Sequence, residues 1–156
     1  MSLSFSNIQR SQLPDIEAME KQLFAQHGYP AFFLRQAYDC WRSGFIVAEC
    51  EHQIAGYVLI VPKADKCNEA WMLSLAVSPA YQGRGIAKKL VKYALARQSH
   101  YQKIYLTVAP DNLPARAIYQ SCGFEILIEE ENYFDDGESR LVMCRTALNP
   151  ASTGAQ

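Results

Sequence analysis

The sequence predicts an α/β (α+β) fold, with a mixed central β-sheet of about six to seven strands and about four helices on both faces. One observation is that the mostly apolar run 71–77 leads through a glycine-containing turn into a helical apolar stripe. Another is that the same order of strand, turn and helix returns between 104 and 123. Shorter β-rich runs precede and follow these two segments. Strands and helices therefore alternate along the chain, and the strands are expected to form one sheet.

Strand candidates are short runs that alternate with a period of two or are rich in β-formers. They are 3–8, 45–49, 54–61, 71–77, 104–108, 124–130 and 141–145. The polar segment 62–69 is predicted to be a loop. A hairpin is expected around Glu51-His52-Gln53.

Helix candidates carry apolar residues at spacings of three and four. The first begins at Ser11 to Pro14, the second ends at Gly44 and the fourth ends at Gly123. Their apolar positions are Ile16, Met19, Leu23 and Phe24, then Leu34, Ala37, Tyr38 and Trp41, then Ala87, Leu90, Val91, Ala94 and Leu95, and last Ala115, Ile118, Tyr119 and Cys122.

Length and composition predict one domain over 1–148, followed by a disordered tail over 149–156. The net charge of −1 and the lack of basic runs interleaved with aromatics disfavour nucleic acid as a ligand. Five widely spaced cysteines without a Cys-x-x-Cys pair are expected to be reduced, and no metal site is predicted. No long apolar stretch or leader pattern is present, so we expect a cytoplasmic protein with no membrane partner.

The turn between 77 and 87 is the most informative segment. Gly83 and Gly85 leave the backbone bare, so successive N–H groups at the start of the following helix can converge on one anion. A glycine turn that only lets strand and helix pack closely is the simpler alternative. The segment lacks the Gly-Lys-Ser/Thr of a nucleoside triphosphate loop and the third glycine of a dinucleotide fingerprint. Its sequence is Gln82-Gly83-Arg84-Gly85-Ile86-Ala87.

This hexapeptide resembles the Gln/Arg-x-x-Gly-x-Gly/Ala motif of the GNAT acetyltransferase superfamily, in which Gln82, Gly85 and Ala87 match in register. The resemblance implies the GNAT acyl-CoA N-acyltransferase fold with a splayed central pair of strands. It also implies acetyl-CoA as acetyl donor, with its pyrophosphate on residues 82–87. The backbone of Leu75, Ala76 and Val77 would then bind the pantetheine arm and polarise the thioester.

The downstream sequence resembles the second half of the same superfamily. Asn112, then Ala117-Ile118-Tyr119, then Gly123-Phe124 follow in the family's order. The resemblance implies that Asn112 contacts the pantetheine arm and that Tyr119 faces the coenzyme sulfur as the catalytic acid. From spacing alone, Tyr119 would instead fill the core on the inner face of its helix.

The general base stays open at the level of sequence. Many members of the superfamily carry a glutamate on a splayed strand, but the inward positions here are Ser74 and Thr107. Neither hydroxyl can act as a base unaided. An α-amino group of pKa about 8 is roughly a tenth neutral at pH 7, whereas a lysine of pKa about 10.4 is almost wholly charged. A site without a strong base therefore suits an N-terminal amine. The run Glu129 to Glu131 is better explained as a solvated strand end.

The resemblance also places the acceptor between two loops that are aromatic in this chain. The segment 132–138 partly resembles the Tyr-Tyr-x-x-Gly-Glu/Asp segment of protein N-terminal acetyltransferases, including those acting on the N-terminal alanine of a ribosomal protein. Phe134 replaces a tyrosine there, and covering the sheet end is an equally good explanation for these aromatics. The expected acceptor-binding residues are Tyr29, Phe32, Phe33, Ser74, Thr107, Tyr133 and Phe134.

These patterns predict an acetyl-CoA-dependent N-acetyltransferase that works by direct attack in a ternary complex, with no cysteine intermediate. The acceptor is a protein or peptide N-terminal amine or, alternatively, a small amine such as a polyamine, an antibiotic or an amino acid. A non-catalytic module that binds acetyl-CoA and regulates a partner is the alternative of another class. The sequence does not distinguish a monomer from a homodimer.

Overall fold

The computed structural model describes residues 2–147, which form two compact units. Within these residues, unit 1 comprises 2–61 and 73–97, and unit 2 comprises 62–72 and 98–147. The expected tail over 149–156 lies outside the described residues. Each unit is built from segments that are distant in sequence, since the chain leaves unit 1 within β3, returns to it within β4 and leaves it again at the end of α3.

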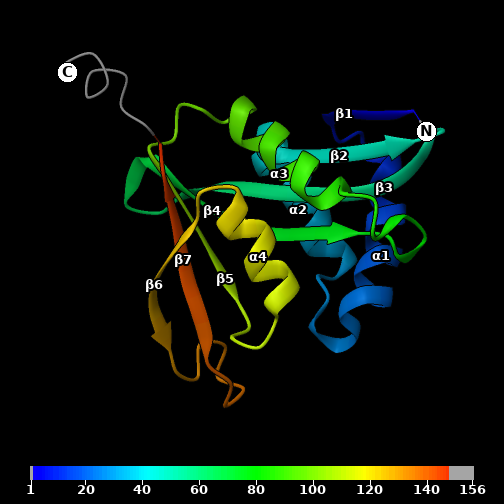
Figure 1. Cartoon of the computed structure of the whole chain (residues 1–156). Coiled ribbons are helices and arrows are strands. Elements are labelled where there is room, and N and C mark those ends of the chain that lie inside the picture. The colour runs from blue at the N-terminus through cyan, green and yellow to red at the C-terminus, as the bar shows by residue number, and fades with distance from the viewer. Residues whose placement is uncertain (1, 148–156) are drawn as a thin grey trace. The chain divides into compact units, whose positions relative to one another are not determined.

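Seven strands are present among residues 2–147, and they pair in the order β1-β2-β3-β4-β5-β7-β6 (Figure 1). The pairing of β4 with β5 is parallel, whereas β1 with β2, β2 with β3, β5 with β7 and β6 with β7 pair antiparallel. The predicted mixed sheet is therefore confirmed. The strands are β1 (Leu3–Asn7), β2 (Phe45–Cys50), β3 (Gln53–Lys63), β4 (Lys66–Val77), β5 (Lys103–Val108), β6 (Glu125–Glu130) and β7 (Arg140–Thr146).

Four α-helices occur in the described part of the chain. They are α1 (Leu13–Phe24), α2 (Ala31–Trp41), α3 (Ile86–Arg97) and α4 (Leu113–Ser121). In unit 1, α1 and α2 lie on one face of the strands and α3 lies on the other (Figure 1). This arrangement buries β2 and β3 on both faces, which is why both strands are nearly continuous runs of apolar residues. By contrast, the first strand alternates, as its sequence predicts.

In unit 2, β7 pairs with β5 on one side and with β6 on the other. The inward side chains of β5 and β7, such as Ile104, Leu106 and Met143, are almost fully buried. All six residues of β6 are exposed, including the glutamates at its end, so the interpretation of that run as a solvated strand end is confirmed.

The prediction of a loop over 62–69 is wrong. Strand β3 continues to Lys63 and β4 begins at Lys66, so only two residues separate neighbouring strands of the sheet. Lys66, Cys67 and Asn68 are exposed, which explains why this part of β4 lacks the apolar pattern of a strand. The strand becomes buried at Glu69 and Ala70, where residues 69–71 pair with β5.

Two further findings concern membrane-spanning helices and cysteines in residues 2–147. In the part described, no helix is long and apolar enough to cross a membrane. The five cysteines are unpaired, with Cys40 and Cys67 exposed and the other three buried.

Candidate coenzyme and acceptor site

The turn between β4 and α3 lies wholly in unit 1 and has the backbone expected of an anion-binding turn. After β4 ends at Val77, a short 3-10 helix (Pro79–Tyr81) leads into Gly83 and Gly85, whose φ angles are +80° and +75°. A Cβ built on either glycine would meet no atom within 4 Å. The glycines are therefore required by the backbone conformation, not by crowding.

Helix α3 begins directly after this turn. The carbonyl of Gly85 accepts a hydrogen bond of 3.3 Å from the Lys89 amide, so the amides of residues 86–88 have no acceptor within the helix. These N–H groups and the positive end of the helix dipole favour a phosphate or diphosphate at this point. The exposed side chains of Lys88 and Lys89 add positive charge on the same turn of helix.

Two side chains brace the turn. The Gln82 amide donates to the Val77 carbonyl at 3.0 Å, which ties the turn to the end of β4. The Arg84 guanidinium lies 5.5 Å from the centre of the Tyr81 ring. The predicted coenzyme residues of unit 1, from Leu75 to Ala87, thus form one continuous strand, turn and helix.

In unit 2, Asn112 is the N-cap of α4. Its Oδ1 accepts from the Ala115 amide at 3.2 Å, and its carbonyl accepts from the Arg116 amide at 3.1 Å. The cap uses only the acceptor atom of the side chain, so the amide nitrogen stays available as a donor. The contact of Asn112 with a pantetheine arm is therefore compatible with its structural role.

Tyr119 lies on α4 with 9% of its surface exposed, and its ring meets Phe124 edge-on with centroids 5.8 Å apart. Burial raises the pKa of Tyr119 to about 12, although the Arg140 guanidinium and its positive charge act in the opposite direction. Within residues 2–147 its hydroxyl makes no hydrogen bond. The ring therefore fills core, and the hydroxyl has no partner among the described residues.

A second group of predicted residues surrounds Arg140 at the start of β7. The guanidinium donates to the carbonyl and to Oγ1 of Thr107, both at 3.4 Å, and lies 5.3 Å from the centre of the Phe134 ring. Tyr133 packs edge-on against Phe134. Thr107, Tyr133, Phe134 and Arg140 are thus neighbours within unit 2. Arg140 was not foreseen from the sequence, because a single arginine at the start of a strand carries no signal.

The remaining predicted acceptor residues belong to unit 1. Tyr29 stacks on Phe33 with centroids 4.3 Å apart, and its hydroxyl donates to the Leu73 carbonyl of β4 at 3.3 Å. Ser74 is the next residue along that strand. Phe32 is 71% exposed and stands apart from this group, which fits an exposed contact surface better than a core position.

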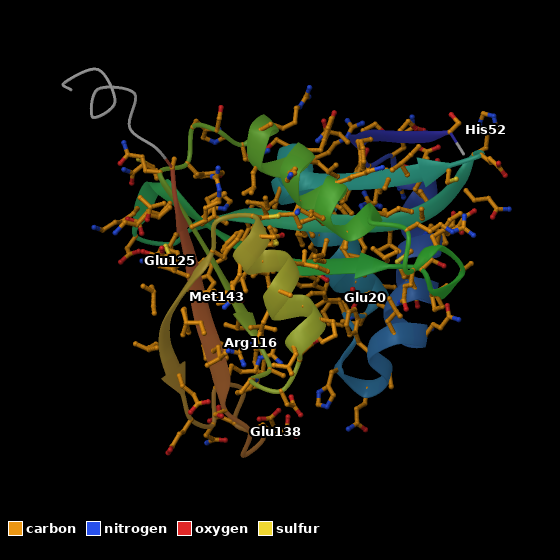
Figure 2. All side chains as sticks on the ribbon, viewed as in Figure 1. Glu20, His52, Arg116, Glu125, Glu138 and Met143 are labelled. Atoms are coloured by element: carbon orange, nitrogen blue, oxygen red, sulfur yellow. The ribbon has the colours of Figure 1, made fainter. Side chains whose placement is uncertain are left out.

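Sequence reasoning missed Glu20, although it is the most buried carboxylate of the described chain, with 1% of its surface exposed. It lies on α1 (Figure 2) and accepts hydrogen bonds from the Tyr29 amide and from the hydroxyls of Tyr57 and Ser74. The signal in the sequence was a charged residue on the apolar face of a predicted helix. Glu20 falls four residues after Ile16 and next to Met19, on the apolar face of the helix.

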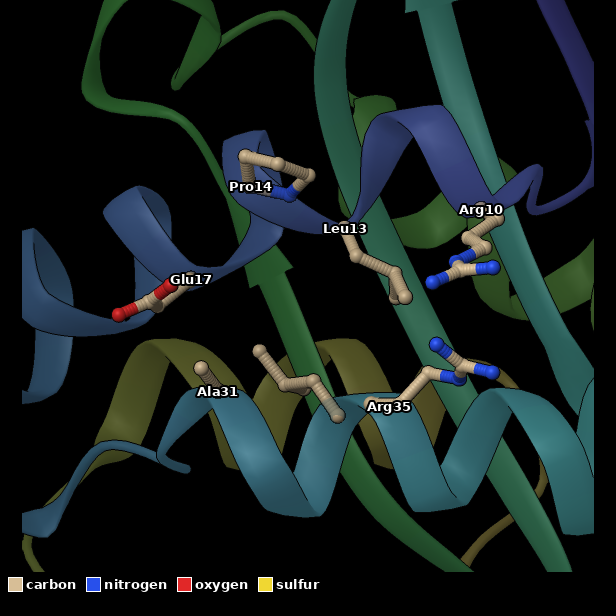
Figure 3. A pocket seen from close by; sticks show the side chains of 7 residues that line it. Arg10, Leu13, Pro14, Glu17, Ala31 and Arg35 are labelled. Atoms are coloured by element: carbon tan, nitrogen blue, oxygen red, sulfur yellow. The ribbon is translucent and has the colours of Figure 1, made fainter.

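A pocket of about 250 Å³ lies between α1 and α2 of unit 1 (Figure 3). It holds none of the predicted site residues. Two of its charged groups are already paired, Glu17 with Lys21 and Arg35 with Asp39, each at 2.9 Å. Its lining consists of Arg10, Leu13, Pro14, Glu17, Ala31, Leu34 and Arg35. We assign it no part in the chemistry.

Residues 2–147 contain no cluster of three or more His, Cys, Asp or Glu side chains that could hold a metal ion. The site residues described above present hydroxyls, a carboxylate, a guanidinium group and backbone amides. Such groups suffice to bind a diphosphate, to polarise a carbonyl and to move a proton.

Comparison with known proteins agrees with this chemistry. The model of the acetyltransferase (GNAT) family matches residues 10–124. An N-alpha-acetyltransferase of Saccharolobus solfataricus is 25% identical over 152 residues, which cover 88% of this chain and 91% of the relative.

Two solved structures share the fold. The ribosomal-protein-S18-alanine N-acetyltransferase of Escherichia coli has a TM-score of 0.81 at 18% identity, covering 95% of this chain and 96% of its own. The diaminobutyrate acetyltransferase of Paenibacillus lautus, in complex with its substrate and coenzyme A, has a TM-score of 0.83 at 14% identity, covering 95% of this chain and 97% of its own. At these identities the likeness shows the fold alone.

Proposed function

The chain belongs to the GNAT acetyltransferase family and is an acetyl-CoA-dependent N-acetyltransferase, and we propose that its acceptor is the N-terminal amine of a protein or peptide. The observation that carries the acetyl-CoA part of this function is the turn from Gln82 to Ala87, where two left-handed glycines precede the first-turn amides of α3. This turn would hold the diphosphate of coenzyme A.

In the proposed reaction, the neutral amine attacks the carbonyl carbon of the thioester in a ternary complex. Backbone amides of Leu75, Ala76 and Val77 would bind the pantetheine arm and stabilise the negative charge that develops on the carbonyl oxygen. The C–N bond forms, the C–S bond breaks, and the coenzyme leaves as a thiolate. Asn112 would contact the coenzyme arm through its amide nitrogen.

Tyr119 would act on the departing thiolate by donating a hydrogen bond. With its pKa raised to about 12, Tyr119 is a weaker acid than a thiol of pKa about 8.5. Complete transfer of its proton to the thiolate would therefore cost roughly 5 kcal/mol. A hydrogen bond stabilises the thiolate without this cost, and the proton that completes the thiol can come from solvent.

An α-amino acceptor fits the acceptor-binding residues better than a lysine side chain does. Thr107 stands where a carboxylate would be expected on β5, and its hydroxyl and carbonyl accept from the Arg140 guanidinium. This guanidinium adds positive charge, which disfavours the protonated form of any amine nearby, and an α-amino group of pKa about 8 loses its proton more readily than a lysine of pKa about 10.4. In unit 1, the aromatic residues Tyr29, Phe32 and Phe33 are the candidates for contact with the side chains that follow the amine. In unit 2, Tyr133 and Phe134 are such candidates for the same chemical reason.

Coenzyme binding is tested with Gly85→Ala. A Cβ at φ +75° is strained, so the substitution shifts the amides of the turn, and the dissociation constant for acetyl-CoA, measured by calorimetry, is expected to rise at least tenfold. Gly137→Ala is the matched control, because Gly137 also has a positive φ of +83° and equally open space around its Cβ. It should lose similar stability and keep the wild-type affinity. Equal affinities in the two variants would contradict the phosphate site.

The acceptor is tested with three sets of compounds. Peptides with a free N-terminus should be acetylated, whereas the same peptides with a blocked N-terminus and an internal lysine should not. Diamines and amino acids form the third set, since a small amine is the alternative acceptor. Products should be followed by mass spectrometry, because the exposed thiols of Cys40 and Cys67 would react with thiol reagents. Acetylation confined to small amines would refute the peptide proposal.

A further inference from the structure

The starting point is the burial of Glu20. A carboxylate removed from water costs several kcal/mol unless hydrogen bonds replace its hydration. Glu20 is 1% exposed, and no Lys or Arg within residues 2–147 forms an ion pair with it. Its charge is therefore supported only by hydrogen-bond donors, which leaves its oxygens as acceptors in the interior of unit 1.

Three donors reach the two oxygens. The Tyr29 amide donates to Oε2 at 3.0 Å. The hydroxyl of Ser74 donates to Oε1 at 3.3 Å, and the hydroxyl of Tyr57 makes a shorter bond to the same oxygen. Tyr29 and Tyr57 are the titratable side chains that face Glu20 from neighbouring elements. Burial and the charge of Glu20 raise the pKa of Tyr57, so its proton stays in place near neutral pH.

Ser74 connects this buried carboxylate to the surface of β4. The residue is partly exposed, and the single proton of its hydroxyl is directed inward to Glu20. Its oxygen lies 2.8 Å from the Tyr57 hydroxyl and has two lone pairs. At least one lone pair is therefore free to accept a hydrogen from a group that approaches from the exposed side.

We propose that Glu20 is the terminal proton acceptor of the acetyl transfer and that the Ser74 hydroxyl carries the proton to it from the acceptor amine. This inference rests on the proposed function and supplies the base that the sequence does not reveal. The Ser74 hydroxyl cannot act as a base unaided. In this relay it would pass its own proton to the Glu20 carboxylate as it accepts one from the amine.

The proton balance is simple. As the amine nitrogen bonds to the thioester carbon, its N–H proton passes to Ser74 Oγ, and the former Oγ proton passes to Glu20 Oε1. The carboxylate becomes a neutral carboxyl group while the thiolate leaves. After the products depart, the proton returns through the same hydroxyl to solvent, which restores the starting state.

A structural role for Glu20 must be separated from this relay. Glu20 also holds the Tyr29 amide, and the Tyr29 hydroxyl reaches the Leu73 carbonyl, so a loss of Glu20 could simply loosen the segment between α1 and α2. Ser74→Ala avoids this problem, because it interrupts the relay and leaves the bonds from Glu20 to Tyr29 and Tyr57 in place. Glu20→Gln keeps the shape of the side chain but removes its basicity.

The experiment measures kcat against pH for Ser74→Ala, Glu20→Gln, the double variant and Ser74→Thr, with a peptide acceptor and saturating acetyl-CoA. Each single variant should lose about a hundredfold in kcat and the acidic limb of its pH profile. The double variant should be no slower than either single variant, since the two residues act as a unit. Ser74→Thr keeps a hydroxyl and should recover most of the activity. Acetyl-CoA affinity should stay within twofold throughout.

Several outcomes would overturn the inference. Ser74→Ala with wild-type kcat and pH profile would do so even if Glu20→Gln fails to fold. Strictly additive losses would show that the two residues do not share one proton path. A wild-type protein that acetylates no amine would refute the proposed function together with the relay, whereas an active wild type with active variants would refute the relay alone.

Discussion

Tyr119 combines a buried ring with a hydroxyl that has no partner among residues 2–147, and this combination makes its two roles separable. Tyr119→Phe keeps the ring packed against Phe124 and removes only the hydroxyl. We expect kcat to fall by about a hundredfold, because the thiolate loses its donor, while acetyl-CoA affinity from calorimetry stays within twofold. Unchanged kcat would show that Tyr119 only fills the core.

Tyr57 is expected to contribute to stability through its hydroxyl. Tyr57→Phe removes a donor from the buried carboxylate of Glu20 and should lower the free energy of unfolding by about 1–3 kcal/mol. Urea denaturation measures this change. Tyr101→Phe is the matched control, since Tyr101 is 8% exposed and its hydroxyl makes no hydrogen bond to the residues described. Equal losses in both variants would mean that the bond to Glu20 adds nothing.

Among the helices, α4 allows capping to be separated from coenzyme binding. Asn112→Ser keeps an oxygen that can accept from the Ala115 amide but removes the side-chain amide nitrogen. Its unfolding free energy should stay within about 0.5 kcal/mol of the wild type, whereas Asn112→Ala should cost about 1 kcal/mol. Both variants should bind acetyl-CoA more weakly in calorimetry. If Asn112→Ser binds as tightly as the wild type, Asn112 is a helix cap and nothing more.

The elements differ in how well the sequence predicts them. The segments around the glycine turn and around Asn112 are predicted well, because apolar spacing, a cap and a stop coincide in each. The start of β4 was missed because Lys66, Cys67 and Asn68 are exposed and therefore lack the apolar pattern by which a strand is recognised. Glu20 and Arg140 were missed because their hydrogen bonds join residues far apart in the sequence. Glu20 bonds to Ser74, and Arg140 bonds to Thr107, only once the chain has folded.

For the whole molecule, the tyrosines predict a loss of stability in alkali. Burial raises the pKa of Tyr119 and Tyr105 to about 12, and burial with the Glu20 charge raises that of Tyr57. In the unfolded chain these phenols release their protons near pH 10. Their contribution to stability is therefore complete below about pH 10 and is lost as the pH rises towards 12, because the unfolded state then binds fewer protons.

Urea denaturation between pH 8 and 11 tests this expectation. Each such tyrosine adds a slope of up to about 1.4 kcal/mol per pH unit above pH 10. Tyr57→Phe should therefore show a shallower decline than the wild type. If the free energy of unfolding falls equally steeply with pH in the wild type and in Tyr57→Phe, the raised pKa of Tyr57 is contradicted.

The distribution of thiols has a practical consequence for following motion. Cys40 is exposed on α2 of unit 1 and Cys67 is exposed on β4 in unit 2, while Cys50, Cys122 and Cys144 are buried. Maleimide dyes would therefore attach at one position in each unit without any engineered residue. The fluorescence of a dye at Cys40 or at Cys67, recorded with and without acetyl-CoA, would report separately on changes around α2 and around the start of β4.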